Sequence, residues 1–475
     1  MPEHIQLYFA SAVFLVTYVI IVSEKVHRAV IALVGAALIA ATKILDPEEA
    51  VHAIDFNTLG LLVGMMIIVG ITRQTGVFEY LAIKAAKSSK GHPLKIMAAL
   101  SLVTAVLSAL LDNVTTVLLI VPVTFAIAQK LRISPIPILI AEILSSNVGG
   151  TATLIGDPPN IMIGSATHLG FMDFIINLAP IIILIYVVTL TLLRLIYRNQ
   201  LSANPERQKS IMELNEKNEL KDTKLLRKCL IVLALTITGF ALHQFLHLES
   251  SVIALSGASL LLLVSREDPE HALHAVEWPV IFFFIGLFVL VGSLEKVGVI
   301  EAVAAASLKI TGGVMVPTSM LILWLSGIAS AFVDNIPFVA TMIPLIKDMG
   351  QIMGVADPAA LNLFWWSLSL GACLGGNGTI IGASANVVVI GMAEKRGAPI
   401  TFMNFFKVAF PLMLVSLVLS SVYMVFWYVY SPAITIGATL IVSVIVGIAV
   451  TPINRMLERN ALKHQPQEQP VALAK

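Results

Sequence analysis

Two Asp-Asn pairs lie inside long apolar stretches of the sequence and are its strongest candidates for chemistry. Asp112-Asn113 and Asp334-Asn335 each interrupt such a stretch. A carboxylate inside hydrocarbon costs at least about 2.5 kcal/mol, so it is seldom retained without a role. Carboxylate and amide oxygens accept hydrogen bonds and attract cations, while amide nitrogens donate. The pairs therefore predict an ion- or substrate-binding site at membrane depth.

Two further segments combine polar residues with residues that break helices. Residues 145–160 contain Gly149-Gly150 and Pro158-Pro159, and residues 371–386 contain Gly375-Gly376. Backbone groups freed at membrane depth must be buried in protein or line a cavity. Unwound carbonyl groups can bind Na⁺, and the positive N-terminal ends of half-helices attract anions. These segments are predicted to be broken helices beside the Asp-Asn pairs.

The candidate binding residues are polar side chains of these four segments. They are Asp112, Asn113, Thr115, Thr116, Asn147, Thr151, Thr153, Asp157, Asn160, Asp334, Asn335, Asn377, Thr379, Ser384 and Asn386. Glu142 is a further acid at this depth, interpreted either as a proton carrier or as a protonated structural residue. The four segments contain no Lys, Arg or His. That composition favours a cation, a proton or a neutral hydroxylated solute over a bare dianion.

The elements that position these residues follow from composition. Hydrophobic residues make up 57% of the chain and charged residues 12%, against about 25% charged in soluble domains. Apolar runs of about 20 residues match the hydrocarbon thickness of a bilayer, which predicts an all-α polytopic membrane protein. A net charge of +1 gives no reason to expect nucleic acid as a partner. We expect no cofactor, no protein metal site other than Na⁺ at the Asp-Asn turns, and no enzymatic activity.

Eleven spans and two re-entrant hairpins are expected. The spans lie near residues 6–22, 29–42, 57–71, 136–165, 173–193, 229–247, 251–265, 279–294, 360–392, 405–428 and 433–450, and the hairpins near 94–131 and 316–347. Each arm of the first hairpin has about 18 residues, so it could also be read as a full span. Trp365-Trp366 is typical of the aromatic belt at a membrane interface.

An internal repeat favours the hairpin interpretation. Gly64, Gly70, Gly76, Glu79, Asp112, Asn113 and Pro122 recur 222 positions later as Gly286, Gly292, Gly298, Glu301, Asp334, Asn335 and Pro344, and Gly150, Thr153, Gly156 and Asn160 recur 226 positions later as Gly376, Thr379, Gly382 and Asn386. Inverted repeats with interrupted helices are typical of secondary transporters. We predict a first repeat at 1–198, a cytoplasmic linker at 199–228, a second repeat at 229–430, and an extra span with a cytoplasmic tail at 431–475.

Basic residues predict the orientation of the chain. Lys25 and Arg28 follow the first span, and Lys130 and Arg132 follow the first hairpin. Because cytoplasmic loops carry an excess of Lys and Arg, we expect the N-terminus outside and the C-terminus in the cytoplasm. The expected location is the inner (cytoplasmic) cell membrane.

Several strings resemble the P protein (pink-eyed dilution) and arsenical pump branch of the ion transporter superfamily. They are Leu111-Asp-Asn-Val-Thr-Thr116, Ile155-Gly-Asp-Pro-Pro-Asn160, Asn335-Ile-Pro337 with Ala340-Thr-Met-Ile-Pro344, and residues 371–386. The resemblance implies a homodimer with elevator-type alternating access. Its arsenical pump branch also allows for association with a cytoplasmic ATPase. Dicarboxylate symporters of the superfamily carry Ser-Asn-Thr motifs at their hairpin tips. The Asp-Asn pairs found here instead argue against a carboxylate cargo.

The leading prediction is a secondary active transporter that exports arsenite or antimonite in exchange for protons. Arsenite is largely neutral As(OH)₃ at neutral pH, which suits Asn and Thr hydrogen bonding. The alternatives are a Na⁺/H⁺ antiporter using Asp112, Asp157 and Asp334, and a sodium-coupled anion or dicarboxylate symporter. A membrane enzyme is disfavoured because no nucleophile–base pair is expected at depth.

Overall fold

The computed structural model describes residues 2–23, 25–167 and 169–463, and the described chain is helical. The first half contains α1 (Glu3–Ser23), α2 (Arg28–Ala41), α3 (Pro47–His52), α4 (Phe56–Arg73), α5 (Val77–Ser88), α6 (Pro93–Leu110), α7 (Asn113–Leu131), α8 (Ile136–Gly150), α9 (Pro158–Thr167) and α10 (Phe171–Tyr197). The linker contains α11 (Pro205–Met212) and a short 3₁₀ turn, Glu216–Glu219.

The second half follows the same order of elements. It contains α12 (Thr223–Leu246), α13 (Ser250–Ser265), α14 (Pro269–Leu273), α15 (Trp278–Lys296), α16 (Val299–Thr311), α17 (Met315–Phe332), α18 (Asn335–Ile352), α19 (Asn362–Gly375), α20 (Ser384–Lys395) and α21 (Phe402–Val429), and α22 (Pro432–Lys463) follows. Ten of the described helices are long and apolar enough to cross a membrane. The all-α polytopic membrane fold predicted from the sequence is confirmed.

Helix length alone does not separate spans from hairpin arms. Three of the four hairpin arms, α6, α7 and α17, are among the ten long helices. Conversely, the predicted spans near 29–42 and 251–265 correspond to the shorter apolar helices α2 and α13, and the one near 136–165 divides into α8 and α9. The expected total of eleven spans therefore combines long helices with short and broken ones.

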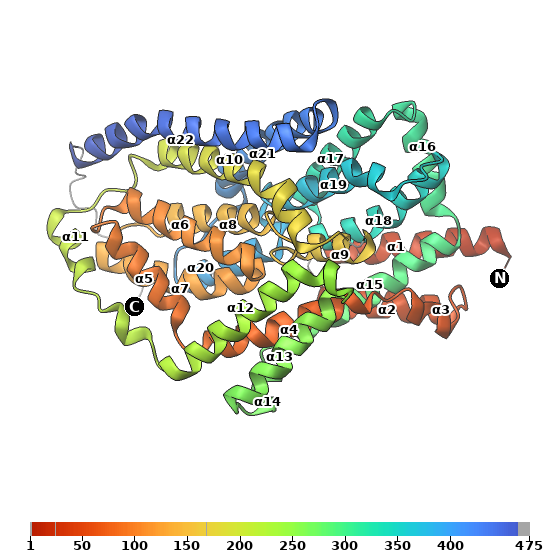
Figure 1. The fold of residues 1–475 in the computed structure, drawn as a ribbon, viewed down its shortest axis with the longest axis horizontal. Helices are drawn as coiled ribbons and strands as arrows, with labels where there is room; N and C mark the ends of the chain where they lie inside the picture. The colour runs from red at the N-terminus through yellow and green to blue at the C-terminus, as the bar shows by residue number, and fades with distance from the viewer. Residues whose placement is uncertain (1, 24, 168, 464–475) are drawn as a thin grey trace.

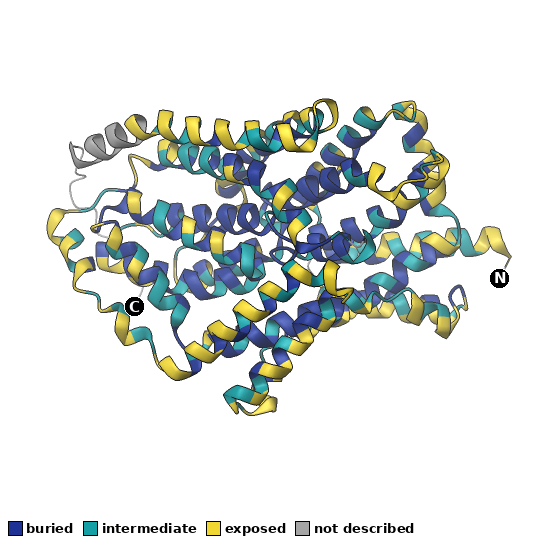
Figure 2. Ribbon diagram, in the orientation of Figure 1, coloured by how far each residue is buried: buried dark blue, intermediate teal, exposed yellow. Residues whose placement is uncertain are grey.

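The helices form two packed groups (Figure 1). In the first, here called the frame, α4 packs on α13, α2 packs on α15, and α1 and α12 lie against these pairs. In the second, here called the core group, α6 packs on α8, α17 packs on α19, and α9 and α20 contact the opposite hairpins through α18 and α7. Helix α22 lies along α10 and α21 at the edge of the molecule, where many residues between 432 and 452 are exposed (Figures 1 and 2).

Close contacts of the frame match across the repeat. A Cβ added to Gly64 would lie 2.6 Å from the carbonyl carbon of Ala254, and one added to Gly286 would lie 2.6 Å from the carbonyl carbon of Ala32. Ala254 stands 222 positions after Ala32, as Gly286 does after Gly64. Each half therefore supplies the glycine to one contact and the alanine to the other, which gives the frame an approximate two-fold relation.

The structure adds detail to one predicted segment, the linker, and corrects the prediction for another, the Trp365-Trp366 pair. The predicted linker at 199–228 is partly helical, and α12 begins at Thr223, inside it. It also packs on the first half, since Lys87 Nζ lies 2.6 Å from Glu216 Oε2. Trp365 and Trp366 do not form an interfacial belt. Both are buried, and the Trp366 ring lies edge-on to Phe174 at 5.1 Å because α19 is enclosed by the core group.

Candidate functional site

Each Asp-Asn pair forms the turn between the two arms of a hairpin. Asp112 is the N-cap of α7, where its Oδ1 accepts a hydrogen bond from the Thr115 amide at 2.9 Å. Asp334 is the N-cap of α18, where its Oδ1 accepts from the Ile336 amide at 3.1 Å. A carboxylate at this position satisfies a free N–H group and lies at the positive end of the helix. Each carboxylate therefore fixes its tip and leaves its second oxygen available for other partners.

The breaks in the two central helices are held by side chains that bind freed carbonyl groups. Asn160 Nδ2 donates to the carbonyl oxygens of Thr151 and Thr153 at 3.1 and 2.8 Å. Asn386 Nδ2 donates to the carbonyl oxygens of Gly376 and Thr379 at 2.8 and 2.9 Å, of which Thr379 is the repeat equivalent of Thr153. The two asparagines thus stabilise the unwound segments after α8 and α19.

One threonine connects each break to its hairpin. Thr153 Oγ1 donates to the Ala109 carbonyl at 2.5 Å, and Thr379 Oγ1 makes the equivalent bond to Ala331. Thr116 and Thr151 donate to carbonyls one turn back in their own helices. These four threonines were predicted to bind the substrate or ion. They lie beside the site, but each hydroxyl group already donates its hydrogen to a backbone carbonyl of the protein.

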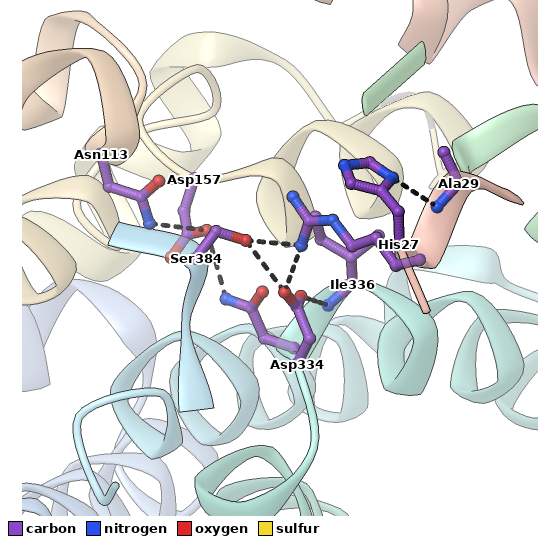
Figure 3. A network of polar contacts seen from close by, with 9 residues as sticks. His27, Ala29, Asn113, Asp157, Asp334, Ile336 and Ser384 are labelled. Carbon is purple, nitrogen blue, oxygen red and sulfur yellow. Dashed lines mark hydrogen bonds and ion pairs between the residues drawn. The ribbon is translucent and has the colours of Figure 1, made fainter. Parts of the chain in front are cut away.

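Asp157 lies where both hairpin tips meet (Figure 3). Its Oδ1 is 3.5 Å from Asn113 Nδ2 and 3.3 Å from Asn335 Nδ2, so it accepts an amide hydrogen from each tip. Its Oδ2 is buried without a hydrogen-bond partner in the described structure, and the residue is 1% exposed. A buried acceptor without a partner is costly unless a proton, ion or solute occupies it. Asp157 is therefore the central acceptor of the site.

An amide network surrounds this carboxylate. Asn147 Nδ2 donates to Asn377 Oδ1 at 2.9 Å and to Asn386 Oδ1 at 3.0 Å, while its Oδ1 lies 3.3 Å from Asn113 Nδ2. Asn113 belongs to the first hairpin, Asn147 to the first broken helix, and Asn377 and Asn386 to the second. Hydrogen bonds thus join segments that are more than 200 positions apart in sequence.

The tips enclose a small central cavity. Its volume is about 30 Å³, which is enough to hold a water molecule or a small ion. Its lining is formed by Arg28, Leu62, Met66, Asp112, Asn113, Val114, Asp157, Pro158, Glu277, Val280, Asn335, Ile336 and Ser384. Five predicted site residues, Asp112, Asn113, Asp157, Asn335 and Ser384, are among them, so the expected convergence of the hairpin tips and breaks is observed.

Two charged residues of the cavity were missed in the sequence. Arg28, the first residue of α2, lies 2.6 Å from Asp334 Oδ2 and 2.7 Å from Ser384 Oγ. Glu277, the N-cap of α15, lines the same cavity. The four polar segments do lack basic residues, but the frame supplies a guanidinium to them. Glu277 could have been found from the repeat, because an acid, Asp55, stands 222 positions earlier at the start of the equivalent helix.

Glu142 lies apart from this cavity. It is fully buried on α8, and the Thr124 hydroxyl of α7 donates to its Oε1. Its Oε2 has no hydrogen-bond partner in the described structure. The residue therefore remains open to both interpretations, a buried proton carrier and a protonated structural acid.

Similarity to known proteins agrees with this architecture. The family model for CitMHS, citrate transporter, matches residues 18–371. The 46 kDa membrane protein of Mycobacterium leprae is 43% identical over 419 residues, covering 87% of this chain and 97% of that protein. The human P protein is 37% identical over 501 residues, covering 88% of this chain and 60% of that protein.

The fold is also similar to that of a solved transporter structure. It is the YdaH transporter of Alcanivorax borkumensis, with a TM-score of 0.55, 17% identity, and coverage of 84% of this chain and 96% of that one. The resemblance to the P protein seen in the sequence is confirmed. The chain belongs to the CitMHS citrate transporter family, together with relatives of the P protein, and is a multi-pass membrane transporter.

Proposed function

We propose that this protein is a secondary active transporter that couples cargo movement to H⁺ or Na⁺ at Asp157. The observation that carries the proposal is the position of the Asp157 carboxylate between the amides of Asn113 and Asn335, with one oxygen free. Asp112 and Glu277 line the same cavity, and Arg28 is already paired with Asp334. The excess of carboxylates attracts a cation or a proton.

Arsenite or antimonite, exported in exchange for protons, is the first cargo to test. A neutral trihydroxy acid can donate hydroxyl hydrogens to the free oxygen of Asp157 and accept hydrogens from the tip amides. A citrate or dicarboxylate anion would instead approach several carboxylates. It could bind only if Arg28 were released from Asp334, which makes sodium-coupled anion symport the third candidate.

Na⁺/H⁺ antiport is the second candidate function. Three aspartates, Asp112, Asp157 and Asp334, approach one region from three different segments. Carboxylate and amide oxygens are suitable ligands for a hard monovalent cation, and alternate binding of Na⁺ and H⁺ by one carboxylate would couple the two ions.

The proposed mechanism is elevator-type alternating access between two inverted repeats, one at 1–198 and one at 229–430. In support, α6 with α8 and α17 with α19 form matched units whose polar ends meet at one cavity, while α2, α4, α13 and α15 pack mainly on one another as the frame. The cargo would move with the core group relative to that frame. The homodimer, the ATPase partner, the inner-membrane location and the N-out, C-in orientation stay predictions.

Flux into proteoliposomes tests the proposal. With an imposed pH gradient, we expect uphill arsenite movement in the native protein and its loss in Asp157→Asn, which keeps the size of the side chain. Parallel measurements with ²²Na⁺ and labelled citrate separate the three cargo classes. Passive conductance without uphill movement of any solute, or full coupling in Asp157→Asn, would refute cation coupling at this residue.

A further inference from the structure

Arg28 connects the frame to the second hairpin and to the second broken helix. It is the first residue of α2, whereas Asp334 is the tip of the α17–α18 hairpin and Ser384 is the first residue of α20. The Arg28 guanidinium bonds both partners. Ser384 Oγ also donates to Asp334 Oδ2 at 2.9 Å (Figure 3). The three side chains form a closed triangle of short polar contacts between the frame and the core group.

This triangle lies between two cavities. The central cavity beside Asp157 has a volume of about 30 Å³. A second cavity of about 260 Å³, here called the vestibule, is lined by His27, Phe332, Asp334 and Val387 among others. Arg28 and Ser384 line both cavities. The polar triangle is therefore the wall that separates the vestibule from the candidate binding site.

The repeat shows that this wall is present in one half only. The positions equivalent to Arg28, Asp334 and Ser384 are Ser250, Asp112 and Pro158. Both helices begin at the equivalent residue, since α2 starts at Arg28 and α13 at Ser250. The aspartate is thus duplicated, but its cationic partner and the bridging hydroxyl are not.

The contacts of the other half confirm the asymmetry. There the frame bonds Ser165, whose Oγ lies 2.9 Å from Asp55 Oδ1 and 3.2 Å from Asn57 Nδ2. Ser165 stands seven residues beyond Pro158, the counterpart of Ser384. Seven residues are two turns of helix, or about 10 Å. The core group is therefore displaced toward one end of the frame, the end at which Arg28 holds Asp334.

We propose that Arg28 is a positioning residue that acts as a one-sided latch: its ion pair with Asp334 closes the central cavity toward the vestibule, and the opposite end of the transport cycle has no equivalent. The proposal rests on the proposed transport function and adds the residue that controls access. Opening the cavity toward the vestibule requires the Arg28–Asp334 pair to separate. In the opposite state the repeat would bring Asp112 toward Ser250, which carries no charge.

Thiol labelling of the purified full-length protein in proteoliposomes tests this without cargo or gradient. Val280→Cys places a reporter in the central cavity, and the native cysteines Cys229 and Cys373 are buried. We expect a membrane-impermeant methanethiosulfonate to label Val280→Cys slowly, and at least tenfold faster when Arg28→Gln is added. Lys25→Gln is the matched control, because it removes the same charge three residues away from an exposed side chain.

The double exchange Arg28→Asp with Asp334→Arg restores an ion pair of opposite direction and should slow labelling again. If Arg28→Gln does not fold, Asp334→Asn breaks the same pair from the other side. Labelling at the parent rate in both single variants, or fast labelling in the double exchange, would overturn the latch. Because labelling needs no cargo, failure of the flux experiment would leave this result unaffected, and the two hypotheses fail separately.

Discussion

The two-turn displacement of the core group predicts the contacts of the opposite transport state. In the structure, Ser165 of α9 bonds Asp55 of the frame. The equivalent pair in the second half is Gly391 with Glu277, because Gly391 follows Ser165 by 226 positions and Glu277 follows Asp55 by 222. That pair is not formed here, since α20 meets the frame through Ser384. If the halves exchange roles, Gly391 should move to Glu277.

The size of the movement follows from helix geometry. Ser384 and Gly391 lie seven residues apart on one face of α20, which corresponds to about 10 Å along the helix. A Cβ added at Gly391 would meet no atom within 4 Å, so a cysteine fits there. Disulfides form when the two Cα atoms lie within about 7 Å. A pair that starts about 10 Å out of register therefore cannot form without the shift.

Paired cysteines measure this directly. The pair Asp55→Cys with Ser165→Cys should oxidise readily in the resting protein, and the pair Glu277→Cys with Gly391→Cys only when the transporter cycles with cargo and a pH gradient. Mass spectrometry of the digested protein identifies each disulfide. Met392→Cys in place of Gly391→Cys is the control, because it faces about 100° away on the helix.

The reasoning is refuted if the second pair never forms under cycling conditions in which the first pair forms readily. It is also refuted if both pairs form equally fast at rest, because the described contacts would then not represent one end of a movement.

Three further predictions concern acidic residues. Asp112→Asn and Asp334→Asn retain the size of the cap while removing its charge, so each should reduce uphill flux at least tenfold with little loss of expression. Full flux in both would exclude these carboxylates from coupling. Glu142→Gln keeps an acceptor for Thr124 outside the cavity, so the pH profile of flux should not change; a shifted profile would identify Glu142 as a proton carrier. The hydrogen bond from the Lys87 ammonium lowers the pKa of Glu216 below its ordinary value. The Lys87–Glu216 ion pair is therefore fully formed at any pH above the ordinary pKa of a glutamate, and it is lost as the pH falls through the lowered pKa of Glu216. Limited proteolysis should accordingly cut the linker faster at acid pH in the native protein, and at neutral pH in Glu216→Gln, whereas equal cutting at all pH values would contradict this role.

Much of the core group could be predicted from the sequence, because the residues that form its turns and breaks are close together in the chain. The caps made by Asp112 and Asp334 join adjacent residues, and the breaks at Gly149-Gly150 and Gly375-Gly376 follow from helix propensity. The repeat then placed the two hairpin tips in equivalent positions. Convergence of the hairpin tips and breaks on one cavity followed from the need to satisfy polar groups at depth, whereas the position of Asp157 between the two tips was seen only in the structure.

The frame's contribution to the site could not be predicted in this way. Arg28 follows the first span together with Lys25, a pattern typical of a cytoplasmic basic cluster. Only the packing of α2 on α15, more than 230 residues later, brings its guanidinium to Asp334. Trp366 was misread for the same reason, because its burial against Phe174 depends on a helix from the other half.

The crossed packing of the frame also constrains the order in which the protein can assemble. Helix α4 ends at Arg73, and its partner α13 begins at Ser250. At about 5–20 residues per second, ribosomes need roughly 10–35 s to make the intervening chain. During that time the face of α4 that carries Gly64 has no partner from its own chain. Asp334, the partner of Arg28, is synthesised later still. The newly made first half must therefore persist in the membrane with an incomplete frame, and its protection during synthesis must come from lipid, insertion machinery or another membrane protein.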